Sequence, residues 1–179
     1  MVMIITPLNI QGAAIVEIQP LRDDRGFFAR SFCEQEFQDA GLALNVVQSN
    51  LSHNKKKGTL RGMHFQASPK PDPKLVSCIQ GSIFDVVVDL RKDSDTYCQW
   101  HGVELTADNH KALFVPPGCA HGFLTLSDDA LVHYQMGEVF VPELARGVRW
   151  DDPTFAIKWP AQPLSIAERD ATYANFTGE

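Results

Sequence analysis

The chain has 179 residues, of which 44% are hydrophobic and 21% are charged, a balance typical of a soluble globular protein. Its formal net charge of −6 gives no general electrostatic attraction to nucleic acid. The apolar runs are too short to cross a bilayer, and the first residues lack the basic segment and cleavage site of a signal peptide. We therefore expect a single domain over residues 1–179 that binds neither nucleic acid nor membrane.

The cysteines are widely spread and form no CxxC pair. They are Cys33, Cys78, Cys98 and Cys119. This spacing favours reduced structural thiols over a disulfide framework or a zinc site. The sequence therefore predicts a cytoplasmic protein.

The first third of the chain alternates short apolar segments with turn residues. The expected strands are residues 14–18, 27–32 and 45–49, with a turn at Arg25-Gly26 before the second strand. Glu34–Ala40 is expected to form a helix, because Phe37 and Ala40 lie three residues apart and Gly41 can end it. The polar, basic residues 52–58 are expected to form a solvated loop.

The stretch Gly58–Gln66, GTLRGMHFQ, has the composition of a β-strand but contains an arginine and a histidine. Strict alternation would send Arg61 and His64 to opposite faces of a sheet. Both can reach one cavity only if the strand bulges, and Gly62 lies where it could do so. A surface arginine with a satisfied core histidine remains the alternative.

The middle of the chain reads as further strands. Residues 67–74 contain three prolines and are expected to form a stiff loop. Strands are then expected at 75–81, 83–90, 98–105, on both sides of a tight turn within 112–126, and as a pair broken near Gly137 within 130–140. Alternation in residues 83–90 places Asp85 on the same face as Ile83 and Val87. There Asp85 either pairs with a basic residue of a cavity or lies on a solvated face.

Strands that recur every 8–12 residues, with Gly, Pro and Asp at the turns, predict an all-β sandwich or barrel. Only the segment Ser165–Thr172 again has a helical pattern. Ser165 is its expected N-cap and Glu168 the partner in a capping box.

The turn PPGCAHGF contains the pattern P-x-G-x-x-H and resembles the second sequence motif of the cupin superfamily, whose fold is a double-stranded β-helix or jelly roll. In metal cupins this histidine, here His121, is a ligand together with an H-x-H pair from the first motif. The corresponding pair here is His64 and Gln66. Glutamine is a poor transition-metal ligand beside imidazole or carboxylate, so we expect no metal site.

A closer resemblance covers the chain from about Arg25 to Asp170. Four segments carry it: RGMHFQ, KLVSCIQGSIFDVVVDLRKDS, VPPGCAHGF and RGVRWDDPTFAIKWP. In order and spacing they resemble the dTDP-4-dehydrorhamnose 3,5-epimerase family. The resemblance implies a metal-free cupin that needs no cofactor and forms a homodimer by exchanging N-terminal strands. It also implies epimerisation beside the keto group of a nucleotide-diphospho-4-keto-6-deoxy sugar.

The resemblance further implies catalytic roles for four residues. His64 would be the base and Asp170 its carboxylate partner, Tyr134 the acid, and Lys74 the group that stabilises the enolate. Apolar neighbours at alternate positions are consistent with an inward-pointing Tyr134. Each residue also has a purely structural alternative: Tyr134 as core filler, Asp170 on a helix surface and Lys74 in solvent.

The same resemblance implies a substrate-binding set. It comprises Arg61, His121, Arg25, Gln48, Asn50, Arg169 and Phe140, some of them reaching across the dimer.

Four positions depart from the usual family pattern. Arg30 and Ala145 replace acidic residues that lie toward the nucleotide, so a nucleotide other than dTDP remains open. Phe140 replaces a tyrosine expected nearer the sugar, and Gln135 replaces a lysine. The loss of the tyrosine hydroxyl suggests epimerisation at a single carbon, as a hypothesis.

Three other functions remain alternatives on sequence alone. They are a metal-dependent cupin oxygenase or isomerase, a non-catalytic cupin that binds sugar nucleotides, and a ketoisomerase that moves the carbonyl between C3 and C4. The last also needs an acid–base pair and differs only in its family motifs.

Overall fold

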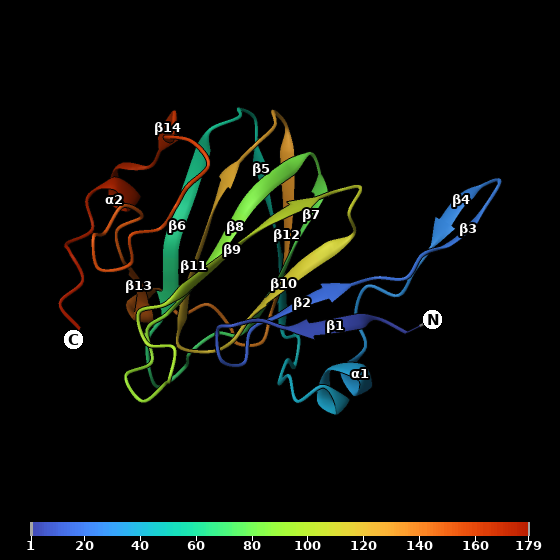
Figure 1. Ribbon diagram of the computed structural model, residues 1–179, viewed down its shortest axis with the longest axis horizontal. Helices are drawn as coiled ribbons and strands as arrows, with labels where there is room; N and C mark the ends of the chain where they lie inside the picture. Colours follow the sequence, from blue (N-terminus) through green and yellow to red (C-terminus); the bar gives the residue numbers. More distant parts are fainter. Residues whose placement is uncertain (1, 179) are drawn as a thin grey trace.

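The computed structural model describes residues 2–178, in which two largely antiparallel sheets pack face to face (Figure 1). The first sheet has the order β1 (Ile4–Pro7), β2 (Ala14–Glu17), β10 (Lys111–Val115), β7 (Lys74–Gln80), β12 (Ala130–Met136) and β5 (Gln48–Asn54). The second has the order β13 (Ala145–Gly147), β6 (Thr59–Gln66), β11 (Cys119–Thr125), β8 (Ser82–Asp89) and β9 (Trp100–Thr106), with β14 (Ser165–Ile166) pairing beside β6. The expected all-β, cupin-like jelly roll is confirmed.

The remaining elements are short. They are the hairpin of β3 (Leu21–Asp23) and β4 (Gly26–Phe28), the helices α1 (Glu34–Asp39) and α2 (Glu168–Ala171), and a 3-10 helix, η1 (Pro142–Leu144). Across residues 2–178, no helix is both long and apolar enough to cross a membrane. All four cysteines are free thiols.

The space between the sheets is filled by side chains that alternate along each strand. In β8, Ile83 and Val87 are fully buried in this inner core, while Val86 and Val88 belong to a second cluster on the outer face. The alternation expected for residues 83–90 is therefore confirmed. It places Asp85 on the inner face, where a charged side chain needs a partner.

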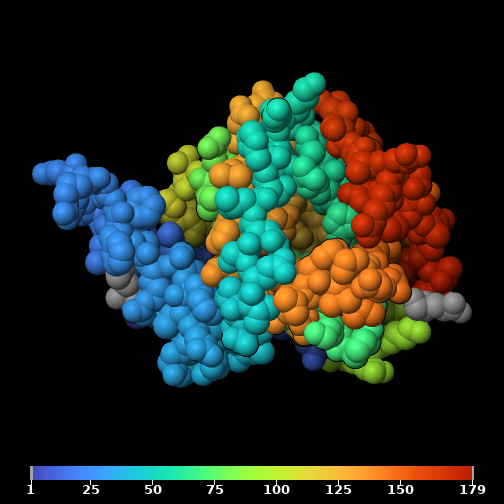
Figure 2. Space-filling model, turned by 180° about the vertical axis from the view of Figure 1, so that it is seen from behind, coloured from blue at the N-terminus to red at the C-terminus, as the bar shows by residue number. Residues whose placement is uncertain are grey.

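Other segments cover much of the outer faces of the two sheets. The ring of Phe37 from α1 packs edge-on against Phe114 of the first sheet, with ring centroids 6.0 Å apart. On the second sheet, the C-terminal segment places Trp159 edge-on against Phe84, at 6.1 Å. The edge strand β5 faces β6 across the open side of the sandwich. Seen from behind, β5 in cyan runs down this side, with a recess between it and the orange-to-red segments (Figure 2).

The strand β6 bulges where the sequence predicted. His64 pairs with His121 and Arg61 with Phe123, so three steps along β6 match two steps along β11. Gly62 at the bulge has a φ of 135°, and a Cβ there would lie 2.5 Å from Gly122 Cα. Only glycine fits this close approach. The extra residue turns Arg61 and His64 toward the same cavity.

Several predicted boundaries are wrong in the first third of the chain. The strand expected at 45–49 is β5, Gln48–Asn54, because it pairs with the whole of β12. The expected loop therefore begins only after Asn54. The strand expected at 27–32 ends at Phe28, since β4 pairs only with β3.

Two further expectations fail later in the chain. Ser165 is not an N-cap, because Ser165 and Ile166 form β14 beside β6 and α2 begins only at Glu168, with Ala167 at its N-cap. The strand pair expected around Gly137 is one strand, β12, followed by η1. The Gly137 backbone N–H donates to Pro73 O at 2.8 Å instead of continuing the ladder.

The β3–β4 hairpin projects from the body of the molecule (Figure 1). Its tip holds Arg25, which pairs with Asp23 of the same hairpin and has an 89% exposed side chain. Leu21, Phe27 and Phe28 on the hairpin are also exposed. An extended apolar arm of this kind is typical of a segment that packs on another chain.

Candidate active site

A cavity of about 290 Å³ lies between the sheets at the open side of the sandwich. It is lined by Asn50, Leu51, Ser52, Arg61, His64, Lys74, His121, Tyr134 and Met136. Six of the candidate residues from the sequence therefore meet in one place. His64 and His121 come from the second sheet, and Lys74 and Tyr134 from the first, so the cavity has reactive groups on facing walls.

His64 is held by a buried carboxylate. Its Nε2 lies 2.7 Å from Asp170 Oδ1, and Asp170 Oδ2 accepts the backbone N–H of Gly62 at 3.1 Å. Burial alone would raise the pKa of Asp170, but the hydrogen bonds from His64 and Gly62 outweigh it and hold that pKa below its usual value. Asp170 is thus a charged partner behind the imidazole, not a surface residue of α2. The His64 side chain remains 43% exposed.

Lys74 is buried and paired with an acid that the sequence did not reveal as part of the site. Its Nζ lies 3.0 Å from Asp72 Oδ2, and the two side chains are 6% and 12% exposed. Lys74 is the first residue of β7 and not the last residue of a solvated loop. The solvent-exposed alternative for Lys74 is therefore wrong.

His121 forms a second buried pair, with Asp85. Nε2 of His121 lies 2.7 Å from Asp85 Oδ1, and the two side chains are 5% and 0% exposed. Within residues 2–178, the second oxygen, Oδ2, has no hydrogen-bond partner. Burial raises the pKa of Asp85, and the charge and hydrogen bond of His121 oppose that rise. Asp85 is thus a partner of a cavity residue and does not lie on a solvated face.

Tyr134 lies beside this pair, with its ring edge-on to His121 at a centroid distance of 5.9 Å. Burial raises the pKa of Tyr134 strongly, and the charge of Asp85 adds to the rise. The phenol is therefore protonated at neutral pH. Such a group can donate a proton but is a poor base in its resting form.

The rim of the cavity is formed by β5 and by the part of β6 around Arg61. Nε of Arg61 donates to Asn54 Oδ1 at 2.7 Å. Nε2 of Gln48 donates to Asn50 Oδ1 at 3.2 Å, and Oε1 of Gln48 accepts the backbone N–H of Phe140 at 3.3 Å. Gln48 thus joins the rim to the segment that carries Phe140.

A smaller cavity of about 190 Å³ adjoins the first and shares His64 and Lys74 with it. Its lining includes Phe140, which is 59% exposed, and the arginines Arg146 and Arg169. Nε of Arg169 donates to the hydroxyl of Tyr173 at 2.7 Å. An exposed aromatic ring in a cavity that two arginines also line is a suitable surface for a flat, anionic ligand.

Gln66, at the second ligand position of the cupin motif, binds backbone. Its Nε2 donates to Lys70 O at 2.7 Å and to Val139 O at 3.1 Å, while Oε1 accepts the Val141 N–H at 2.7 Å. The side chain thus ties two loops together at the floor of the smaller cavity.

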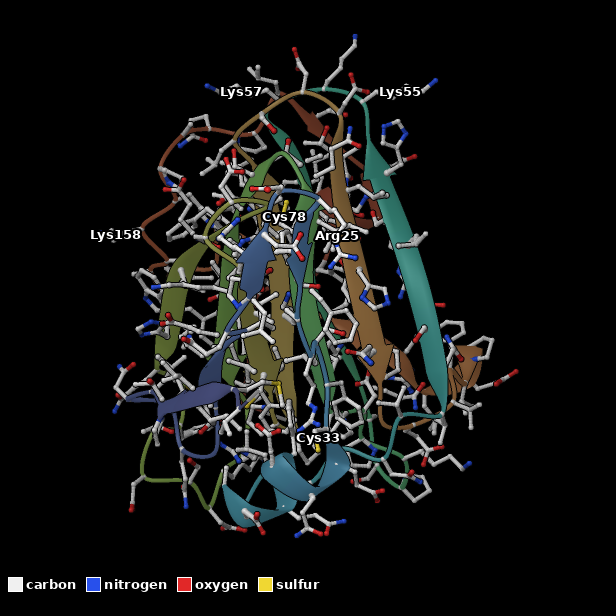
Figure 3. The ribbon with its side chains drawn as sticks, turned by 90° about the vertical axis from the view of Figure 1, so that its right-hand side faces the viewer. Arg25, Cys33, Lys55, Lys57, Cys78 and Lys158 are labelled. Atoms are coloured by element: carbon white, nitrogen blue, oxygen red, sulfur yellow. The ribbon has the colours of Figure 1, made fainter. Side chains whose placement is uncertain are left out.

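One candidate residue and two of the unusual positions lie apart from the cavities within this chain. Arg25 is on the projecting hairpin, in front of the first sheet (Figure 3). Arg30 pairs with Glu36 at 2.6 Å, beside α1. Gln135 faces the other side of the first sheet, in a separate cavity of about 280 Å³ that Phe27 also lines. Ala145 lies in the smaller cavity beside Arg146.

Residues 7–178 match the family model described as dTDP-4-dehydrorhamnose 3,5-epimerase. The chain belongs to this family. A relative of that name from Methanothermobacter thermautotrophicus is 46% identical over 168 residues, which cover 92% of this chain and 90% of the relative.

Two solved structures show the same fold. The dTDP-4-dehydrorhamnose 3,5-epimerase of Bacillus anthracis, solved with TDP and PPi bound, superposes with a TM-score of 0.94 at 40% identity and covers 97% of this chain and 99% of its own. ChmJ from Streptomyces bikiniensis, a 3'-monoepimerase in complex with dTDP-quinovose, superposes with a TM-score of 0.85 at 32% identity and covers 92% and 84%. The fold is thus shared by relatives named for one inverted carbon and for two.

Membership of the epimerase family gives the geometry a chemical meaning. An imidazole hydrogen-bonded to a buried carboxylate, the amine of Lys74 and a protonated phenol line a space that could hold a sugar ring. The sequence missed Asp72 because its only local signal is a position between two prolines. It missed Tyr173 because nothing in the helical pattern shows that this ring lies edge-on to His64, at a centroid distance of 6.3 Å.

Proposed function

We propose that this protein epimerises C3 and C5 of a nucleotide-diphospho-4-keto-6-deoxy sugar through an enolate intermediate. The observation that carries the proposal is the position of His64 and Tyr134. They lie on facing sheets and line one cavity, which Lys74 of the first sheet also lines. Inversion of a carbon requires a base on one side of the ring and an acid on the other.

His64 removes the proton next to the C4 carbonyl. As the C–H bond breaks, its electron pair forms the enolate and negative charge develops on the carbonyl oxygen. The Asp170 carboxylate stabilises the imidazolium that results. The ammonium group of Lys74 stabilises the enolate oxygen, and in an enclosed site this charge interaction is strong.

Tyr134 then donates its proton to the opposite face of the same carbon, which inverts the centre. Its raised pKa keeps the phenol protonated until the electron-rich enolate carbon is present. His64 loses its extra proton and Tyr134 regains one, so the enzyme returns to its starting state. The same two groups can then act at the second carbon.

The nucleotide and diphosphate occupy the rim and the smaller cavity. Arg61, His121 and Arg169 supply positive charge or hydrogen-bond donors there, and Gln48 and Asn50 supply amide groups. The exposed ring of Phe140 offers a stacking surface for the base.

A homodimer completes each site in this proposal. The projecting hairpin brings Arg25 to the partner's substrate, and its apolar residues Leu21 and Phe28 pack on the outer face of the partner's first sheet. Exposed Ile79 on that face supports this packing. The whole chain acts as one domain, and its four free thiols favour the cytoplasm as its compartment.

Epimerisation at a single carbon is a second candidate. Phe140 lacks the hydroxyl of the usual tyrosine, and a 3'-monoepimerase shares the fold. Arg30 and Ala145 similarly leave open a nucleotide other than dTDP.

Proton NMR in deuterated water tests both candidates, with dTDP-, CDP- and GDP-linked 4-keto-6-deoxyglucose supplied in turn. Deuterium is expected at both C3 and C5 of one of these substrates at turnover rates. Incorporation at one carbon alone would favour the monofunctional enzyme. His64→Ala is expected to abolish exchange, whereas His101→Ala, a histidine on β9 that bonds Asn9, is the matched control and is expected to leave it unchanged. Exchange that survived in His64→Ala would show that another group is the base.

A further inference from the structure

We propose that Asp72 is a positioning residue that fixes the ammonium group of Lys74 against the reacting sugar and keeps it charged. The inference rests on the proposed role of Lys74 at the enolate oxygen. It assigns a function to an acid that touches no part of the reacting centre itself.

The Asp72 carboxylate is held at both oxygens. Oδ2 lies 3.0 Å from Lys74 Nζ, and Oδ1 accepts the backbone N–H of Gln66 at 3.1 Å. One oxygen is therefore tied to the end of β6, the strand that also carries His64. Through Asp72, the position of the ammonium group is set by the same strand that positions the base.

The loop that carries Asp72 is anchored on both sides. Asp72 lies between Pro71 and Pro73, whose rings fix two backbone φ angles. Pro73 O accepts the Gly137 N–H at 2.8 Å, and Lys70 O accepts the Gln66 side-chain amide at 2.7 Å. The loop therefore holds Asp72 in one defined position. Lys74 is thus preorganised and does not have to be ordered when substrate binds.

The charges around Lys74 are mostly positive or already paired. Titratable and charged groups approach it from six other elements: Arg61 and His64 on β6, Asp85 on β8, His121 on β11, Tyr134 on β12, Arg146 on β13 and Arg169 on α2. The acid of this set, Asp85, is hydrogen-bonded to His121. Among the described residues, Asp72 is the acid within ion-pair distance of Lys74.

An ammonium group in such an enclosed place needs this counter-charge. Burial without a partner favours the neutral amine, because the charged form loses its hydration. A neutral amine would still fit beside the enolate oxygen but would stabilise its negative charge far less. Removal of the Asp72 charge should therefore reduce turnover more than binding, and most strongly at alkaline pH.

The test compares Asp72→Asn with the unmodified protein in deuterium exchange from pH 6 to pH 10. We expect kcat to fall roughly 10- to 100-fold with little change in KM, and the alkaline limb of the rate profile to move to lower pH. Asp72→Glu keeps the charge and is expected to retain the original alkaline limb. Asp151→Asn, a surface acid paired with Arg149, is the matched control and should behave as the unmodified protein.

A double-mutant cycle with Lys74→Ala separates positioning from mere support of the fold. If Asp72 acts through Lys74, Asp72→Asn causes no further loss of kcat in the Lys74→Ala background. An equal additional loss in that background would overturn the inference, and so would an unchanged rate and pH profile in Asp72→Asn. The neutral variant Asp72→Gln serves the same tests should Asp72→Asn fail to fold. Absence of exchange by the unmodified protein would instead contradict the proposed function.

Discussion

At the scale of single residues, the site is built from pairs in which a buried acid lies within bonding distance of a cavity residue. Asp170 supports His64, Asp72 supports Lys74 and Asp85 supports His121. A buried carboxylate fixes the orientation of its partner. His64, Lys74 and His121 are therefore held in defined positions, as the proposed proton transfer requires.

Tyr134→Phe should separate proton removal from inversion. His64 can still remove a proton and return deuterium to the same face, but the acid on the opposite face is lost. We expect deuterium to enter the unreacted substrate while the epimerised product falls at least ~100-fold. NMR and chromatography of the same samples measure both quantities. Tyr97→Phe is the control, and an equal loss of exchange and inversion would contradict the assignment of Tyr134 as the acid.

Asp170→Asn should change how stability depends on pH. Because the pKa of Asp170 is lowered in the folded protein, its carboxylate stabilises the fold above the unfolded pKa of about 4, and this contribution is lost as pH falls through the folded pKa. The difference in unfolding free energy between the two proteins should therefore be largest near pH 6 and shrink below about pH 4. Urea unfolding at several pH values measures it. A difference that is constant over this range would show that the charge of Asp170 contributes nothing.

At the scale of elements, the bulge in β6 decides whether there is a site at all. Without the extra residue, alternation would turn Arg61 away from the cavity that His64 faces. Gly62 allows the bulge because the strand passes close to Gly122 of β11. The glycine is thus a requirement of the site and of the packing together.

Gly62→Ala is expected to lower the unfolding free energy by at least ~2 kcal/mol, because the new Cβ would meet Gly122 Cα and the φ of 135° is strained for alanine. Gly41→Ala is the matched control. It also has a positive φ, 73°, but within residues 2–178 its Cβ would meet no atom closer than 4 Å, so a loss of only about 1 kcal/mol is expected. Denaturant unfolding compares the two, and equal losses would mean that the close approach at Gly62 is unimportant.

At the scale of the whole molecule, the hairpin is the part of the structure that a single chain leaves unexplained. It projects away from the site, yet it carries Arg25 and a row of exposed apolar residues (Figures 1 and 3). The proposed dimer explains both features, because it buries the apolar residues and places the guanidinium beside the partner's substrate.

Mixed dimers test this arrangement. Arg25→Ala and His64→Ala are each expected to reduce activity as homodimers. If Arg25 acts in the partner's site, a dimer of one subunit of each kind contains one site with both defects and one site with neither. Subunit mixing should then restore exchange above either parent, as measured by NMR after co-refolding. No restoration in a verified heterodimer would place Arg25 in the site of its own chain.

Much of the fold follows from local sequence patterns. Alternation along residues 83–90 correctly divides that strand between the inner core and the outer face, and the PPGCAHGF turn correctly begins a strand that carries His121 inward. The bulge at Gly62 could also be predicted, because Arg61 and His64, three residues apart in a strand, can face the same cavity only if the strand bulges between them. These features depend on the alternation of side chains along a strand and on the local backbone conformation, which neighbouring residues determine.

Tertiary structure decided the features that depend on partners distant in sequence. β5 extends to Asn54 because β12 lies beside it. Ser165 lies in a strand because the edge of β6 is free to pair with it. The pairing of Asp85 with His121 and of Asp72 with Lys74 likewise arises only when separate strands and a loop enclose one space. The sequence by itself determined most of the strands, the family and the candidate groups. Burial, which exists only in the folded chain, decided which charges meet and so how the site can move a proton.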